Sequence, residues 1–169
     1  TRIIEQSSGR VAVYFPSYEV MQQIAKAAKL DLPLVVEERG TRILDVLRFL
    51  KNHEQCVVFG VARGKISEGV DMTIEGRSML SAVIVVGLPY PKRSELQSAL
   101  YEYFRQKFRH KAIEYANDIP CLNALAQAAG RLLRSPEDKG IIVIMDGRVA
   151  GKFKQKLPKE WRNEMKPHL

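Results

Sequence analysis

Two apolar stretches decide the fold class, Ala82-Val-Ile-Val-Val-Gly-Leu88 and Ile141-Ile-Val-Ile-Met145. Both are short, continuous and rich in β-branched residues, as is typical of strands that are buried on both faces of a parallel sheet. Three further runs of this kind precede them, at Val11–Phe15, Leu34–Val36 and Cys56–Val61. The sequence therefore predicts a mainly parallel sheet that is covered by helices on both faces.

The stretches between these runs have helical periodicity. Tyr18–Leu30 and Thr41–Asn52 are amphipathic, and Ser94–Asn117 is expected to form a longer and more charged helix. Asp118 is expected to cap the next helix, which has Pro120 in its first turn. The alternation of strands and helices predicts one three-layer α/β domain.

Length and composition agree with a single globular domain. The chain has 169 residues, of which 46% are hydrophobic and 27% are charged. No apolar run approaches the roughly 18 residues that cross a bilayer, and no signal peptide opens the chain, so we expect neither membrane insertion nor secretion. Only Cys56 and Cys121 are available as thiols, which excludes a zinc finger, a cysteine-ligated iron–sulfur cluster and a disulfide scaffold within this chain. We expect no metal site.

The formal net charge of +8 is unevenly distributed. The basic tail 148–169 has seven basic and two acidic residues, and it is expected to contain a short helix at Pro158–Met165 that Trp161 anchors. A second basic cluster runs from Arg105 to Lys111. These charges indicate a polyanionic partner without identifying one, and both runs are equally interpretable as solvated surfaces.

One segment that follows a predicted strand is rich in glycine and in polar and charged residues: Val61-Ala-Arg-Gly-Lys-Ile-Ser-Glu-Gly-Val-Asp71. Gly64 and Gly69 allow a ligand to approach the backbone closely, and successive N–H groups there are expected to form an anion-binding nest. An ordinary polar loop is the open alternative. The side chains suited to contact phosphate or sugar are Arg63, Lys65, Ser67 and Asp71.

A second segment combines an amide with two guanidinium groups, Gln127-Ala-Ala-Gly-Arg-Leu-Leu-Arg134. If the segment is helical, steps of about 100° place Arg131 and Arg134 within roughly 40° of Gln127, on one narrow face. Gly130 is expected to permit close approach to another element. Two guanidinium groups on one face suit a terminal phosphate in transfer, although a solvated helix face is the open alternative.

Several catalytic motifs are missing from the sequence. There is no GxxxxGK[ST] loop to cradle phosphates, and no Asp-Glu pair ends a predicted strand to hold Mg²⁺; the Glu37-Glu38 pair comes closest. The sequence also has no GxSxG and no HExxH. We therefore expect the chain to hold only part of a catalytic site.

The two polar segments resemble motifs V and VI of the XPD/DinG-like iron–sulfur DNA helicases of superfamily 2. VAVYFPSY at 11–18 is similar to their motif IV region, VIVVGLPYP at 83–91 to the strand and loop after motif V, and GIIVIMDGRV at 140–149 to their closing strand. The resemblance covers residues 10–161. It implies that residues 1–169 form a second RecA-like motor domain, similar to a P-loop NTPase but without its own P-loop.

The resemblance also implies roles for individual residues. Arg134, Arg131 and Gln127 would face the γ-phosphate of ATP, with Arg134 as the arginine finger. Gly69, Asp71 and Gly130 would line the nucleotide side. The residues that would contact the backbone of single-stranded DNA are Ser17, Tyr18, Arg63, Lys65 and Ser67.

The family's Walker A lysine and its four cluster cysteines belong to a first motor domain and are absent here. The resemblance implies a monomeric 5′-to-3′ helicase that uses ATP and Mg²⁺ at a site shared with that domain, whose iron–sulfur cluster lies outside this chain. It would act in the nucleus, or at the nucleoid in the cytoplasm of a prokaryote. The isolated chain is expected to be inactive as an ATPase. The alternative is a stand-alone nucleic-acid-binding or partner-docking domain without ATPase activity.

Overall fold

The computed structural model describes residues 2–69 and 71–166. One position of the motif V segment, residue 70, and the last three residues of the predicted basic tail lie outside the described residues.

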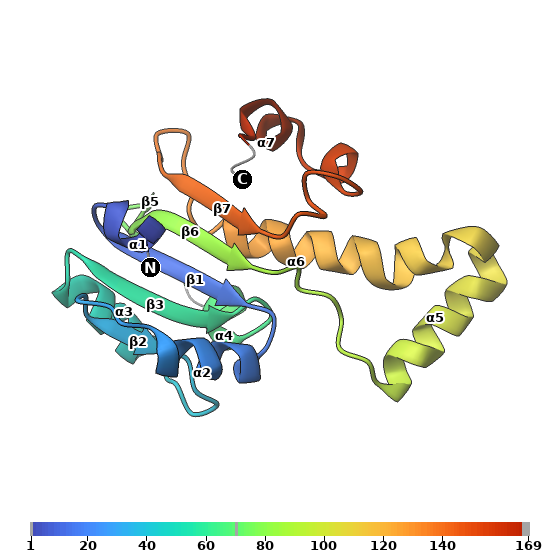
Figure 1. Ribbon diagram of the computed structural model, residues 1–169, viewed down its shortest axis with the longest axis horizontal. Helices are drawn as coiled ribbons and strands as arrows, with labels where there is room; N and C mark the ends of the chain where they lie inside the picture. The colour runs from blue at the N-terminus through green and yellow to red at the C-terminus, as the bar shows by residue number, and fades with distance from the viewer. Residues whose placement is uncertain (1, 70, 167–169) are drawn as a thin grey trace.

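The five predicted apolar runs form one parallel sheet, as expected (Figure 1). The order across the sheet is β2-β3-β1-β6-β7, so the first strand along the chain lies at the centre. A short antiparallel hairpin between β3 and β6, made of β4 (Thr73–Ile74) and β5 (Arg77–Ser78), was not expected. The bounds of the sheet strands are β1 Arg10–Phe15, β2 Leu34–Val36, β3 Cys56–Val61, β6 Leu80–Val86 and β7 Ile141–Met145.

Helices cover both faces of this sheet, which confirms the three-layer prediction. On one face, Ile4 of α1 (Arg2–Gln6) and Met21 of α2 (Tyr18–Ala27) pack on alternate residues of β1, β3 and β6. The remaining strand residues face a second apolar core on the other side. This core is covered by α3 (Ile43–Asn52), α4 (Lys65–Gly69), α6 (Ile119–Ala129) and the C-terminal segment.

The predicted long helix 94–117 is interrupted, and its first part projects from the domain. The helix α5 (Glu95–Phe108) ends where Arg109 adopts a positive φ of 46°, and it extends away from the sheet in Figure 1. The chain then returns through η1 (Arg109–Lys111) and the π-helical η2 (Glu114–Asp118) into α6. No residue of α5 is buried.

Asp118 does not cap α6, contrary to the prediction. Its backbone is helical and continues directly from η2 into α6, so no free helix start exists there for its side chain to cap. The buried carboxylate instead lies 3.1 Å from Nζ of Lys152 and accepts a hydrogen bond from the Tyr90 hydroxyl at 3.5 Å. Pro120 does lie in the first turn of α6, as expected.

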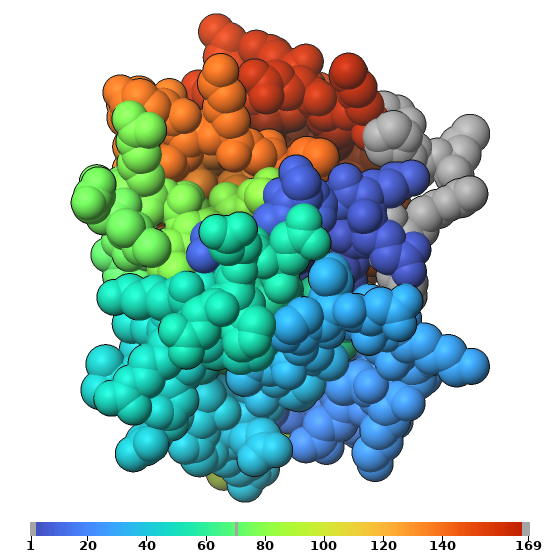
Figure 2. All heavy atoms as spheres, turned by 90° about the vertical axis from the view of Figure 1, so that its left-hand side faces the viewer, coloured from blue at the N-terminus to red at the C-terminus, as the bar shows by residue number. Residues whose placement is uncertain are grey.

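The basic tail is packed against the domain over its described part. Phe153 and Leu157 are buried in the same core as α6, and Trp161 of α7 (Lys159–Glu164) packs against that core, which confirms the predicted anchor. In Figure 2 this segment, in orange and red, covers one side of the molecule. Lys156, in η3 (Lys154–Lys156), forms an ion pair with Glu114 at 2.7 Å, so part of the tail's positive charge is neutralised within the domain. No helix in the described ranges is long and apolar enough to span a bilayer.

Candidate functional site

Two of the segments that the sequence singled out lie at the carboxyl edge of the sheet, where open parallel sheets bind ligands, and the third lies on the face that α4 and α6 cover. Ser17 and Tyr18 follow β1, and the motif V segment follows β3 and forms a turn and then α4. The motif VI segment begins in the last turn of α6 and lies beside α4. The fold thus brings motifs V and VI into contact through residues that are 64 positions apart in the sequence.

A buried carboxylate occupies the centre of the motif V turn. Glu37 is fully buried, and its Oε2 accepts a hydrogen bond from the Val61 amide at 2.8 Å. Its Oε1 accepts bonds from the Lys65 amide at 2.8 Å and from the Tyr18 hydroxyl at 2.9 Å. The amides that we expected to bind an external anion therefore bind an internal one.

The close packing of this turn around Glu37 requires a glycine at position 64. A Cβ atom on Gly64 would lie 2.5 Å from Oε1 of Glu37, closer than any tolerated contact, so no other residue fits without displacing the carboxylate. Burial, and then the hydrogen bond to Glu37, raise the pKa of Tyr18 to about 12, so this phenol stays protonated and donates. From the sequence, Glu37 stood out only as part of the nearest match to a metal-binding Asp-Glu pair. Its position directly after a predicted strand was the signal for a larger role.

The other predicted DNA-contacting residues make contacts within the domain. The Ser17 side chain accepts a hydrogen bond from the Val20 amide and caps α2, while the buried Ser67 hydroxyl donates to the Gly64 carbonyl. The Arg63 and Lys65 side chains are exposed. Arg63 donates to the carbonyl oxygens of Pro89 and Pro120, and Lys65 to that of Arg39. A role of these residues in DNA contact stays a prediction.

The motif VI segment is not one helix, which corrects the expected geometry. The helix α6 ends at Ala129, and Gly130 is its C-cap, so Arg131 and Arg134 lie in the turns beyond it. A Cβ on Gly130 would lie 2.9 Å from the Ala126 carbonyl oxygen. The close approach that we expected of Gly130 is therefore to the last turn of its own helix and not to another element.

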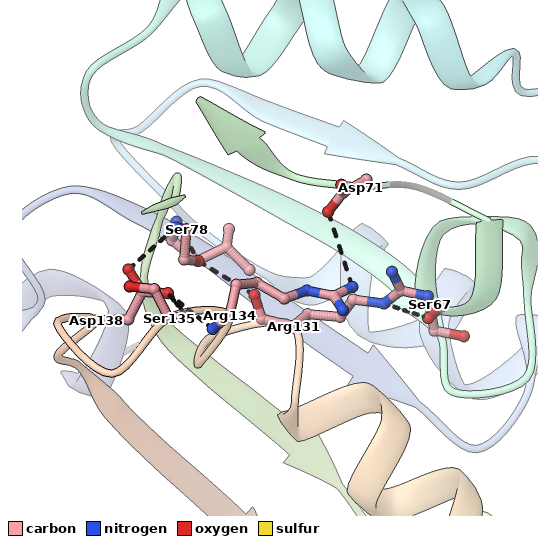
Figure 3. Close-up of polar contacts among 8 residues, drawn as sticks. Ser67, Asp71, Ser78, Arg131, Arg134, Ser135 and Asp138 are labelled. Atoms are coloured by element: carbon pink, nitrogen blue, oxygen red, sulfur yellow. Dashed lines mark hydrogen bonds and ion pairs between the residues drawn. The ribbon is translucent and has the colours of Figure 1, made fainter. Parts of the chain in front are cut away.

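Arg131 bridges the two motifs (Figure 3). Its Nε donates to the Ser67 carbonyl in α4 at 2.7 Å, and its own carbonyl accepts a hydrogen bond from the Ser78 hydroxyl in β5 at 3.1 Å. The unexpected hairpin thus holds the backbone of Arg131, and α4 holds its guanidinium. Backbone and side chain are both fixed before any ligand binds.

Arg134 is held by its backbone and leaves its side chain more exposed. Its amide donates to Asp138 at 2.7 Å, and its guanidinium lies 3.9 Å from Oδ1 of Asp71 (Figure 3). Burial raises the pKa of Asp138, but the amides of Ser135, Arg134 and Ser78 more than offset this and hold it below its usual value. Asp138 is therefore ionised at neutral pH and anchors the turn that carries Arg134.

An open pocket of about 440 Å³ lies beside the two arginines. Gln127, Arg131 and Arg134, which the sequence predicted to act together, all reach it although they do not share a helix face. Glu68 is the fourth polar residue that lines this pocket, and no role was predicted for it from the sequence. Two guanidinium groups and an amide beside a glycine backbone suit an anion with several oxygen acceptors, such as a phosphate chain.

The described residues contain no group of three or more His, Cys, Asp or Glu side chains that would hold a metal ion. Cys56 and Cys121 are both buried and free. Burial raises the pKa of both thiols, that of Cys121 to about 11. They therefore stay protonated at neutral pH and are poorly suited to ligate a metal.

Comparison with known proteins identifies the family of this fold and site. A family model described as a helicase C-terminal domain matches residues 1–164. The chain belongs to this helicase family.

Individual relatives agree with this assignment. The ATP-dependent DNA helicase XPD of Sulfolobus acidocaldarius is 30% identical over 147 residues, which cover 87% of this chain and 26% of the relative. The general transcription and DNA repair factor IIH helicase subunit XPD of Schizosaccharomyces pombe is 37% identical over 166 residues, covering 88% of this chain and 21% of the subunit. A solved XPD helicase structure superposes with a TM-score of 0.79 at 29% identity, over 92% of this chain and 28% of its own.

The predicted resemblance to XPD-like helicases is thus confirmed, and the helicase C-terminal domain corresponds to 21% to 28% of the length of these relatives.

Proposed function

We propose that this chain is the second motor domain of an ATP-dependent DNA helicase and that its pocket receives the terminal phosphate of ATP. The convergence of Gln127, Arg131 and Arg134 on one pocket carries the proposal. A domain that only binds DNA or docks a partner has no need of an amide and two guanidinium groups in a pocket beside a glycine. The names of the relatives, which are ATP-dependent DNA helicases, support it.

The two arginines are suited to different tasks. Arg131 is held by α4 and is suited to orient the phosphate. The Arg134 side chain is 35% exposed, and its ion pair with Asp71 is long, at 3.9 Å, so Arg134 is the better arginine finger. Asp71 would then be released to accept a hydrogen bond from the ribose. Closure of a first motor domain onto this face brings the phosphate to the arginines, and hydrolysis removes that link.

We propose that single-stranded DNA binds at the carboxyl edge of the sheet. Ser17, Tyr18, Arg63, Lys65 and Ser67 belong to segments that would line the path of single-stranded DNA, along which alternate grip by two motor domains moves the protein 5′ to 3′. We propose that Mg²⁺ binds with ATP at the site shared with the first motor domain and that the iron–sulfur cluster lies outside this chain, whose only cysteines are Cys56 and Cys121. The helicase would act as a monomer at DNA.

The decisive experiment removes the finger. In the complete helicase, Arg134→Ala is expected to lower DNA-stimulated ATP turnover by about 10³–10⁵-fold while nucleotide affinity stays within a few fold, because a finger acts on transition-state charge. Arg42→Ala is the matched control, since this exposed arginine pairs with Asp45 outside the pocket. Turnover close to wild type in Arg134→Ala would contradict the proposal.

A second measurement separates this function from the stand-alone binding domain. The isolated chain should fold and show no ATP hydrolysis, and addition of the first motor domain should restore DNA-stimulated hydrolysis. Hydrolysis by the isolated chain would show that it holds a complete site. A combination that binds DNA but never hydrolyses ATP would favour the binding domain.

A further inference from the structure

We propose that Glu37 is a positioning residue that couples the DNA-facing loop after β1 to the arginines of the nucleotide pocket, with α4 as the connecting element. The inference rests on the proposed function and adds to it a physical link between the two ligand sites. Three successive contacts carry it: one from the loop to Glu37, one from Glu37 to α4, and one from α4 to Arg131.

The first contact joins Glu37 to the loop after β1. The Tyr18 hydroxyl donates to Oε1 of Glu37 at 2.9 Å, and Tyr18 is the first residue of α2, directly after the cap Ser17. A strand of DNA that binds at Ser17 and Tyr18 therefore presses on a side chain whose polar end is fixed to Glu37. The Tyr18 ring is partly exposed, so it is accessible from the surface.

The second contact transmits any movement of Glu37 to α4. The same Oε1 accepts the amide of Lys65, the first residue of α4, while Oε2 holds the Val61 amide at the end of β3. A Cβ on Gly64 would lie 2.5 Å from Oε1, so the carboxylate is packed closely against the turn that these amides belong to. Displacement of Glu37 by Tyr18 therefore requires the start of α4 to move relative to β3.

The third contact connects α4 to the pocket. The Ser67 carbonyl accepts a hydrogen bond from Nε of Arg131 at 2.7 Å, and the next residue, Glu68, lines the same pocket as Arg131. The helix α4 has only five residues, and Ile66 and Ser67 are fully buried, so it is expected to move as one body. A shift at Lys65 would then reach both Glu68 and the Arg131 guanidinium.

The choice of a carboxylate at this buried position supports a coupling role over simple packing. A fully buried charge is costly, and apolar side chains of similar volume often stabilise a core as well or better. Glu37 satisfies its charge with donors from three separate places in the chain, the loop after β1, the end of β3 and the start of α4. An apolar residue would fill the space and connect none of them.

The test separates DNA binding from DNA stimulation in the complete helicase. Glu37→Gln keeps the shape of the side chain but cannot accept all three hydrogen bonds, because one oxygen becomes an NH₂ donor. We expect ATP turnover at saturating oligo(dT) to fall at least tenfold, with the dissociation constant for fluorescent oligo(dT) changing less than threefold. An unchanged turnover, or an equal factor in both measurements, would overturn the coupling role.

A milder variant covers the case in which Glu37→Gln fails to fold, as judged by circular dichroism. Tyr18→Phe removes only the first contact and is expected to lower stimulated turnover at least threefold. Tyr90→Phe is the control, because its hydroxyl lies beside the other buried carboxylate, Asp118, outside the three contacts. Equal effects of the two tyrosine variants would overturn the proposal.

Combining the two substitutions tests whether they act in one chain of contacts. If they do, Tyr18→Phe adds no further loss to Glu37→Gln, whereas independent effects multiply. A wild-type helicase without DNA-stimulated hydrolysis would overturn the proposed function together with the coupling. A normally stimulated wild type with unaffected variants would overturn the coupling alone.

Discussion

The carboxyl edge of the sheet and the projecting helix α5 are both rich in charged side chains, but they hold them differently. At the edge, Glu37 binds groups 19, 24 and 28 positions away, and beside it, on the face of the sheet, Arg131 binds a carbonyl 64 positions away. On α5, Arg105 pairs with Glu102 three positions away, and Lys107 bonds to Tyr103 four positions away.

Contacts within one helix form and break without the rest of the fold and contribute only a few tenths of a kcal/mol each. Contacts between distant segments exist only when the whole domain is folded, and they fix the geometry of the groups that make them. The range of the contacts therefore distinguishes a polar cluster that is built into the fold from one that is simply solvated. Three substitutions test this difference.

Within the two regions compared, the largest effect on stability is expected at the edge. Gly64→Ala places a methyl group against the Glu37 carboxylate and should lower the free energy of unfolding by about 1–3 kcal/mol, as overpacking does elsewhere. Gly40→Ala is the control, because its Cβ would meet nothing within 4 Å. Urea denaturation of both variants measures the difference. Equal stabilities would show that the turn around Glu37 is not tightly held.

The next substitution tests one group at the edge that has no partner. The Tyr14 hydroxyl is buried without a hydrogen bond in the described structure, and burial raises its pKa. Tyr14→Phe should therefore increase the free energy of unfolding by about 1 kcal/mol, because an unsatisfied buried hydroxyl is removed. Tyr18→Phe should lower it by about the same amount. Loss of stability in Tyr14→Phe would mean that its hydroxyl is satisfied in solution.

The smallest effect is expected on α5. Leu96 is 79% exposed, so Leu96→Ser should change the free energy of unfolding by no more than about 0.5 kcal/mol. Leu125→Ala in the buried part of α6 is the contrast, with an expected loss of about 2–5 kcal/mol. A large loss in Leu96→Ser would show that α5 packs against the domain in solution, and the comparison between the two regions would fail.

The three central strands, β1, β3 and β6, were predictable because they are buried on both faces and are therefore almost continuously apolar. The edge strands β2 and β7 were found by the same apolar pattern, although both are only partly buried. The hydrophobic periodicity of a sequence does not show where a helix ends when a change in backbone conformation ends it. The run 94–117 keeps its helical periodicity across Arg109, whose positive φ ends α5, and nothing in the residue types marks that position. The hairpin β4–β5 was missed because two-residue strands are too short to show alternation.

The members of the pocket were predictable, but their arrangement was not. Gln127, Arg131 and Arg134 line one pocket, yet the reason given for it, a shared helix face, was wrong because α6 ends at Ala129. The positions of the two arginines are set by Ser67, Ser78 and Asp138, which lie outside α6. Glu37 was missed for the same reason, since its partners become neighbours only through the sheet topology.

The central place of β1 in the sheet has a consequence for synthesis of the chain. Val11 pairs with Val57 on one side and with Ala82 on the other, so both edges of β1 pair with strands that are synthesised later. Such non-local pairing makes folding slow and leaves strand edges open to other chains. The middle of the sheet can therefore close only after the ribosome has synthesised Val86, and both edges of β1 stay unpaired until the later strands have formed.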